Sequence, residues 1–216
     1  MHCRRSAVLL LFWVLALSNA FAQKVDVSFL AGGSFVSDSN ENFLCIPELT
    51  CPQQKFKTGH QFFFQGAAAY RFAHLGPASL TLELPVAVVP SQRLTVSGFC
   101  CTLGHVTTTF VTPSLRVKLL PRAPISPFFS FGAGWARYSL TQNVVNKGAL
   151  QYGGGLDVKT PAPHLSLRFE VRDFVTGDPG FGHSAIFVGN LVFDGMFQSG
   201  LHRHNVLPAA GVVFHF

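Results

Sequence analysis

The stretch LSLRFEVR, residues 165–172, decides the fold because apolar and polar residues alternate in it without interruption. Leucine, phenylalanine and valine occupy every second position, while serine, arginine and glutamate lie between them. Successive side chains of a β-strand point to opposite faces, so this strand has one apolar face and one charged face. Arg168, Glu170 and Arg172 share the charged face. Such a strand separates an apolar environment from a polar one.

The same two-residue period recurs along the chain, for example over residues 80–86 and 111–119. We expect eight strands, at residues 24–36, 59–73, 79–89, 107–120, 127–140, 148–160, 164–176 and 205–216. They are longer than the usual strand of about five or six residues. A strand of about ten residues crosses a hydrocarbon layer at a tilt.

The composition favours strands with an unusual surface. Hydrophobic residues make up 48% of the 216 residues and charged residues only 12%, about half the charged share of a soluble domain. The chain has 23 Phe and 20 Gly, a mixture typical of strands and close backbone contact. The apolar fraction excludes intrinsic disorder. The 16 basic residues outnumber 10 acidic ones but form no run, which argues against nucleic acid as a partner.

The first residues, 1–22, have the pattern of a cleaved secretory signal peptide. Arg4 and Arg5 precede an apolar run, 7–17, that is too short to span a bilayer. The sequence Ala20-Phe21-Ala22 fits the small-x-small cleavage rule. We therefore expect an exported mature chain, residues 23–216, that forms one domain.

The connections between the expected strands alternate in length. Short, proline-marked connections fall at 74–78, 121–126 and 161–163, and longer ones at 37–58, 90–106, 141–147 and 177–204. An even number of antiparallel strands with short turns at one end is typical of transmembrane barrels, whose short turns face the periplasm. The predicted fold is therefore all-β: an eight-stranded, antiparallel, up-and-down transmembrane β-barrel.

Three segments carry a family resemblance. The glycine-rich stretch 128–136 and the pair 152–158 and 167–174 resemble strands of small outer-membrane barrels of the OmpA and OmpX type. The chain end 212–216 looks like their terminal strand, which closes on an aromatic residue. The resemblance implies the outer membrane of a Gram-negative-type bacterium. It also implies that Phe214 and Phe216 form an assembly signal recognised by the barrel-assembly machinery.

The alternation assigns the two faces of the expected barrel. Phe62, Phe64, Leu82, Leu84, Phe129, Phe131, Phe169, Val171, Phe214 and Phe216 are expected to face lipid, with Tyr70, Trp135 and Phe216 near the interfaces. The other face carries Asp26 and a predicted ion network of Glu83, Arg116, Lys118, Asp157, Arg168, Glu170 and Arg172. A barrel of eight strands is only wide enough to be filled by side chains, so these charges should pair. Gly153 and Gly155 would make room for the arginines.

The residue pattern supplies no catalytic site. Carboxylates beside basic groups can be catalytic, but no nucleophile follows from the pattern, and neighbours such as His183 and Ser184 point apart on an extended chain. The pair His202 and His204 is interpreted as solvated loop histidines rather than a metal site. We expect no enzymatic activity, cofactor or metal.

Four cysteines fall in expected outer loops, Cys45 and Cys51 in the first and Cys100 and Cys101 in the second. An exported chain should oxidise them. Three connectivities exist, and neighbouring cysteines rarely form an unstrained bridge, which favours bridges between the two loops.

The function expected from the sequence is that of a monomeric outer-membrane barrel with a plugged, charge-paired lumen and a structural or surface-interaction role. Its expected partners are outer-membrane lipids, the assembly machinery and an extracellular ligand at the long loops. A lipid-A-modifying barrel enzyme is one alternative, and it requires a serine, a histidine and an acid together near the outer-leaflet rim. A narrow pore is another alternative. A soluble lipocalin-like barrel would instead reverse the faces, with Arg168, Glu170 and Arg172 pointing outward.

Overall fold

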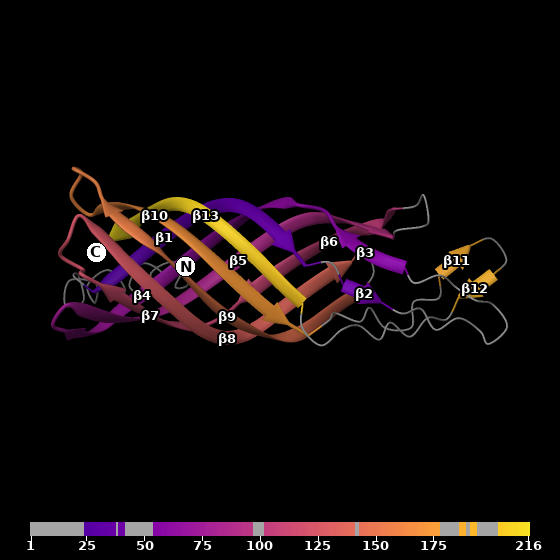
Figure 1. Cartoon of the computed structure of the whole chain (residues 1–216), viewed down its shortest axis with the longest axis horizontal. Helices are drawn as coiled ribbons and strands as arrows, with labels where there is room; N and C mark the ends of the chain where they lie inside the picture. Colours follow the sequence, from indigo (N-terminus) through magenta and orange to yellow (C-terminus); the bar gives the residue numbers. More distant parts are fainter. Residues whose placement is uncertain are drawn as a thin grey trace, which may run out of the picture.

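The computed structural model describes residues 24–37, 39–41, 54–96, 102–140, 143–177, 186–188, 191–193 and 203–216. Its wall is built from β1 (Val25–Val36), β4 (Gln61–Leu75), β5 (Ala78–Val96), β6 (Thr102–Val111), β7 (Ser114–Leu119), β8 (Ile125–Leu140), β9 (Asn143–Lys159), β10 (Leu165–Thr176) and β13 (Arg203–His215). The short strands β2 (Ser39–Glu41), β3 (Gln54–Thr58), β11 (Ile186–Val188) and β12 (Leu191–Phe193) lie beyond the wall (Figure 1). No helix among the described residues is long and apolar enough to cross a membrane.

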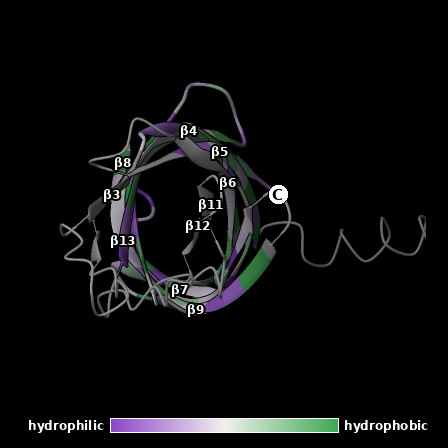
Figure 2. Cartoon of the chain, turned by 90° about the vertical axis from the view of Figure 1, so that its right-hand side faces the viewer, coloured by the Kyte–Doolittle hydropathy of each residue, from purple (hydrophilic) through white to green (hydrophobic). Residues whose placement is uncertain are grey.

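The wall strands form a closed antiparallel ring. Neighbours in sequence pair with one another, β6 and β7 share one position between β5 and β8, and β13 pairs with β1. The ring therefore has eight positions, which confirms the predicted up-and-down barrel. Figure 2 looks along the barrel axis and shows the strands closing around the lumen.

The two ends of the barrel differ, as the connection lengths predict. We call the end with connections 76–77, 120–124 and 160–164 the short-turn end; β13 also finishes there. The opposite, long-loop end carries β2, β3, β11 and β12 (Figure 1). One expected loop is wrong: residues 143–147 belong to β9, so only 141–142 separate β8 from β9. Strand β5 likewise runs on to Val96, beyond its expected end at residue 89.

The fourth wall position is broken between β6 and β7, where one continuous strand was expected. Pro113 lies at the break and has no N–H to donate to a neighbouring strand. Its carbonyl still accepts a hydrogen bond from the Ala133 N–H at 3.2 Å. Gly134 faces this region from β8, and a Cβ atom there would lie 2.0 Å from the Val111 carbonyl oxygen. Glycine therefore permits the close approach of the two wall segments.

The alternating pattern sorts the side chains as predicted. Exposed apolar side chains on the outer face include Phe62, Phe64, Leu82, Leu84, Phe129, Phe131, Phe169, Val171, Phe214 and Phe216. Arg168, Glu170 and Arg172 on β10 are instead 1%, 3% and 1% exposed. The charged face of that strand points into the barrel, which excludes the lipocalin-like alternative.

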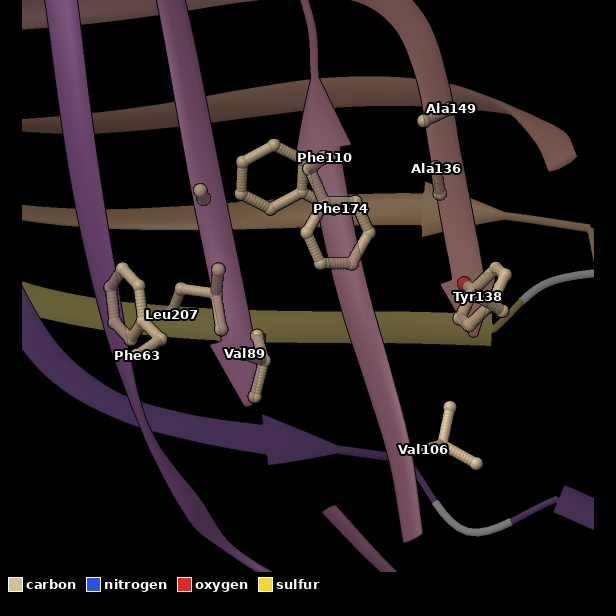
Figure 3. Packing of buried hydrophobic residues seen from close by; sticks show 10 residues of the cluster. Phe63, Val89, Val106, Phe110, Ala136, Tyr138, Ala149, Phe174 and Leu207 are labelled. Atoms are coloured by element: carbon tan, nitrogen blue, oxygen red, sulfur yellow. The ribbon is translucent and has the colours of Figure 1, made fainter. Parts of the chain in front are cut away.

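The inner face has a second, apolar layer that alternation does not predict. Toward the long-loop end, inward side chains form a buried cluster of Phe63, Ala87, Val89, Val106, Phe110, Ala136, Tyr138, Ala149, Phe174 and Leu207 (Figure 3). The rings of Phe110 and Phe174 stack with centroids 4.4 Å apart. The hydroxyl of Tyr138 is hydrogen-bonded to that of Thr176 at 2.7 Å. We call this set the apolar layer.

Candidate functional site in the barrel lumen

The buried charges lie in the half of the lumen nearer the short-turn end. Four carboxylates, Asp26, Glu83, Asp157 and Glu170, face four cations, Arg116, Lys118, Arg168 and Arg172, and each of these residues is at most 7% exposed. The count of charges is balanced once Asp26 is included with the seven predicted residues. We call these eight residues the ion network.

Glu83 is the centre of the ion network, because its carboxylate contacts three arginines from two wall positions. Its Oε1 lies 3.4 Å from guanidinium nitrogens of both Arg116 and Arg168. Its Oε2 lies 3.0 Å from Arg172. A buried carboxylate among several guanidinium groups remains ionised only while those partners offset its desolvation.

Two forked ion pairs flank Glu83. Arg168 donates from Nε and Nη2 to the two oxygens of Asp157 at 2.7 and 3.0 Å. Arg172 donates in the same way to Glu170 at 2.6 and 3.0 Å. Such bidentate pairs combine two charge-assisted hydrogen bonds with a fixed orientation. The register of β10 against β9 places Arg168 opposite Asp157. Glu170 and Arg172 lie two residues apart on the same face of β10.

The remaining cations have less complete sets of partners. Lys118 Nζ lies 2.7 Å from Asp157. Arg116 reaches Asp26 at 3.5 Å and Glu83 at 3.4 Å, and its Nε has no hydrogen-bond partner among the described residues. Arg116 is therefore the most weakly compensated cation of the network.

Several members of this site escape sequence reasoning. Gln65 donates to Glu170 at 2.7 Å, and Gln151 donates to the Ser130 hydroxyl at 2.9 Å. The ring of Phe128 lies beneath the guanidinium groups of Arg116 and Arg168, at 5.6 and 4.8 Å from its centroid. Even spacing from Asp157 places Gln151 on the inner face, whereas β8 has no inward charge that would mark Phe128. Only the register between strands shows what these side chains touch.

Two of the glycines of β9, Gly153 and Gly155, have different neighbours. A Cβ at Gly153 would lie 3.0 Å from Arg172 Cγ, so this glycine does make room for an arginine. A Cβ at Gly155 would lie 2.7 Å from the Phe128 ring instead. The expectation that both glycines accommodate arginines is therefore correct for Gly153 and wrong for Gly155.

Glu170 has fewer partners than its position between two arginines suggests. Its forked pair is with Arg172, whereas Arg168 forks to Asp157. Lys118 also binds Asp157. The position of Glu170 between two arginines in the sequence favours it as the centre of the network, but Glu83 occupies that place.

His204 lies in β13 rather than in a loop, although its side chain is 44% exposed. Its Nδ1 lies 2.6 Å from Asp173 Oδ2, which also accepts a hydrogen bond from Tyr152 at 2.7 Å. The Ser37 hydroxyl contacts the backbone of His204, accepting from its N–H at 3.1 Å. A histidine and an acid thus meet near the long-loop end, and the Ser37 hydroxyl there hydrogen-bonds to the main chain of His204.

Other predicted positions lie outside the described residues. These are the signal peptide, residues 1–22, and Ser184, His183, His202, Cys45, Cys51, Cys100 and Cys101. Within the described part of the chain, no group of three or more His, Cys, Asp or Glu is arranged to hold a metal ion.

Comparison with solved structures supports the fold. No family model matches the sequence, and no curated protein matches it either. The outer membrane protein OprG from Pseudomonas aeruginosa aligns with a TM-score of 0.57 at 14% identity, over 90% of this chain and 97% of that chain. Neisserial surface protein A aligns with a TM-score of 0.53 at 13% identity, over 89% and 97% of the two chains.

A third structure, the outer membrane protein AlkL, aligns with a TM-score of 0.53 at 15% identity, over 91% of this chain and 92% of that chain. At such identities the likeness concerns the fold. It agrees with the apolar exterior and charged interior described above. The chain therefore has the fold and the lipid-facing exterior of the small eight-stranded β-barrels of the Gram-negative outer membrane.

Proposed function

We propose that the protein is a monomeric outer-membrane barrel whose lumen is closed to ions by two successive layers, and that its role is structural or one of surface interaction rather than transport. The observation that carries this proposal is the filling of the lumen. The ion network occupies the half near the short-turn end, and the apolar layer occupies the half near the long-loop end.

The ion network favours a plug because its charges are satisfied by one another. Each of the four buried cations has a carboxylate oxygen within 3.5 Å. Moving an ion through this layer would require separating pairs that burial has already desolvated. Separating such pairs is costly because each charge that loses its partner remains buried.

The apolar layer adds an independent barrier of a different kind. Phe63, Phe110 and Phe174 are 0% exposed and point toward the interior. Water is unstable in a narrow apolar constriction, and channels use such constrictions to stop ions. A plug with both layers is therefore expected to exclude ions even if one layer is loosened.

The long-loop end supports the proposed surface role. Strands β3, β5 and β6 extend the sheet there, and β2 pairs with β3. In barrels of this architecture the longer loops face outward and the short turns face the periplasm. We therefore place an extracellular ligand at these loops, lipid around the wall, and the assembly machinery at the terminal strand with Phe214 and Phe216. We also propose that the four loop cysteines are oxidised.

Conductance in planar bilayers tests the closed lumen. The intact protein should give little or no steady current. Replacing both Phe110 and Phe174 by serine opens the apolar layer, and Glu83→Ala loosens the ion network; current is expected only when the changes are combined. Phe129→Ala removes an equally large ring from the outer face, where Phe129 is 63% exposed. This variant should give no steady current.

A steady current from the intact protein would overturn the plug. If Glu170→Ala also shifted its selectivity toward anions with little loss of stability, the narrow-pore alternative would replace it. A lipid-A-modifying enzyme would instead be indicated by removal or transfer of an acyl chain on purified lipid A.

A further inference from the structure

His215, the penultimate residue, joins two side chains that no sequence motif connects. Its Nδ1 lies 2.8 Å from Asp26 Oδ1, and its Nε2 lies 2.9 Å from the Ser166 hydroxyl. The three residues come from β13, β1 and β10, which are consecutive wall strands. A serine, an imidazole and a carboxylate are thus linked in series through opposite nitrogens of one ring.

The backbone holds this arrangement firmly. The His215 N–H donates to the His164 carbonyl at 2.9 Å, and the Phe216 N–H donates to the Val25 carbonyl at 2.8 Å. Ser166 follows the turn 160–164, which Thr160 fixes by donating its hydroxyl to the Leu165 carbonyl at 2.7 Å. The terminal residues of β13 are therefore bound on both sides, and the histidine ring is positioned between two ordered strands.

We propose that Ser166, His215 and Asp26 form a nucleophilic serine centre at the short-turn end of the lumen, able to take the acyl group from a small ester. A carboxylate at Nδ1 selects the tautomer that carries its proton there. Nε2 is then free to accept the proton of the Ser166 hydroxyl. This is the series of roles in which an acid orients a base and the base activates a nucleophile.

The reaction balances with water as the second reactant. The Ser166 oxygen bonds to the carbonyl carbon of the ester while its proton moves to His215 Nε2. The bond from that carbon to the leaving oxygen then breaks, and His215 returns the proton to the departing alcohol. Water attacks the acyl-serine by the same route, which releases the carboxylic acid and restores the hydroxyl.

Burial restricts the substrate and sets the side from which it enters. Ser166 is 3% exposed, whereas the side chains of His215 and Arg71 are 26% and 22% exposed. Arg71 lies 3.6 Å from Asp26, so a partly exposed cation also lies beside this centre. Asp26 also pairs with Arg116 at 3.5 Å, which connects this centre to the rest of the ion network. We infer that a small acyl ester reaches the serine from the short-turn end, which is the periplasmic end in such barrels.

The test uses the full-length barrel folded in detergent, with a fluorophosphonate reporter and p-nitrophenyl acetate as probes. The reporter should label the folded form of the unsubstituted protein, and mass spectrometry should locate the label on Ser166. Ser166→Ala should abolish labelling. His215→Asn and Asp26→Asn should slow it, the former by about 100-fold or more because a general base contributes at least that factor.

Ser28→Ala is the matched control. Ser28 is also an inward serine of the lumen and is 3% exposed, so its loss should leave labelling unchanged. Each variant is compared only in its folded form, separated on unboiled gels. Mapping the label on the unsubstituted protein needs no variant and protects the test against misfolding. An unlabelled folded barrel, or equal labelling of Ser166→Ala, would overturn the proposal. The three residues would then only hydrogen-bond neighbouring strands to one another.

Discussion

Removal of the Glu83 carboxylate tests whether the ion network holds the barrel together. In Glu83→Ala, four buried cations face three carboxylates. Arg168 and Arg172 keep their forked partners, but Arg116 keeps only Asp26 at 3.5 Å. The excess charge therefore falls on the cation whose Nε already lacks a partner among the described residues.

The expected loss is large for a single substitution. Removing one partner of a buried ion pair costs about 3 to 5 kcal/mol. At about 2 to 4 °C per kcal/mol for a chain of this size, the unfolding midpoint should fall by about 6 to 20 °C. Water that enters the lumen would bring the loss toward the lower value. The midpoint is measured as the temperature at which the compact form disappears from unboiled gels, with Trp fluorescence as a second probe.

A second substitution tests whether the unpaired charge of Arg116 causes the loss. Arg116→Met removes the orphaned charge and keeps an apolar stem over Phe128. The double variant should be more stable than Glu83→Ala alone, with a coupling of about 0.5 to 3 kcal/mol. Leu84→Ala, at the neighbouring outward position, controls for truncation in β5. Strictly additive losses, or a Glu83→Ala midpoint equal to that of the intact protein, would show that the pairing does not stabilise the barrel.

Three further outcomes can be checked. Glu170→Ala should lower the midpoint less than Glu83→Ala, because Arg172 retains Glu83 at 3.0 Å; an equal or larger fall on the same gels would contradict this. Gly134→Ala should prevent or destabilise ring closure, because its Cβ would lie 2.0 Å from a carbonyl oxygen, whereas Gly148→Ala has nothing within 4 Å; similar yields of heat-modifiable barrel would refute the contrast. Deletion of Phe216 should reduce assembly in cells more than refolding in detergent, and equal insertion of the two chains by quantitative blotting would count against an assembly signal.

The strands and their lipid faces could be predicted because the two sides of the wall differ in polarity. Ser130 and Arg168 alternate with Phe129 and Phe169, so the two-residue period is visible. The period fades where both sides are apolar. Phe63 points inward between the outward Phe62 and Phe64, and no pattern in that run reveals which ring is buried. The apolar layer was missed for this reason.

The contacts between side chains in the lumen could not be predicted from the sequence, for a second reason. Parity along a strand places Glu83 and Arg172 on the inner face, but their contact joins β5 to β10, which are not neighbours in the wall. Such contacts depend on register, on the shear of the ring and on side-chain length together. The link from Ser166 to His215 and Asp26 joins neighbouring strands instead, but it too depends on a register that the sequence does not specify.

The pairing of Asp26 with His215 joins residues 189 positions apart, where β13 closes the ring against β1. This long separation has a consequence for folding. The other strand pairs of the wall join strands that are close in sequence and can form in the order of synthesis. This one cannot form before β13 has been made. Until then the sheet keeps two unsatisfied edges that can template aggregation, and closing so long a loop is slow. The edges are therefore protected against aggregation only once β13 has paired with β1.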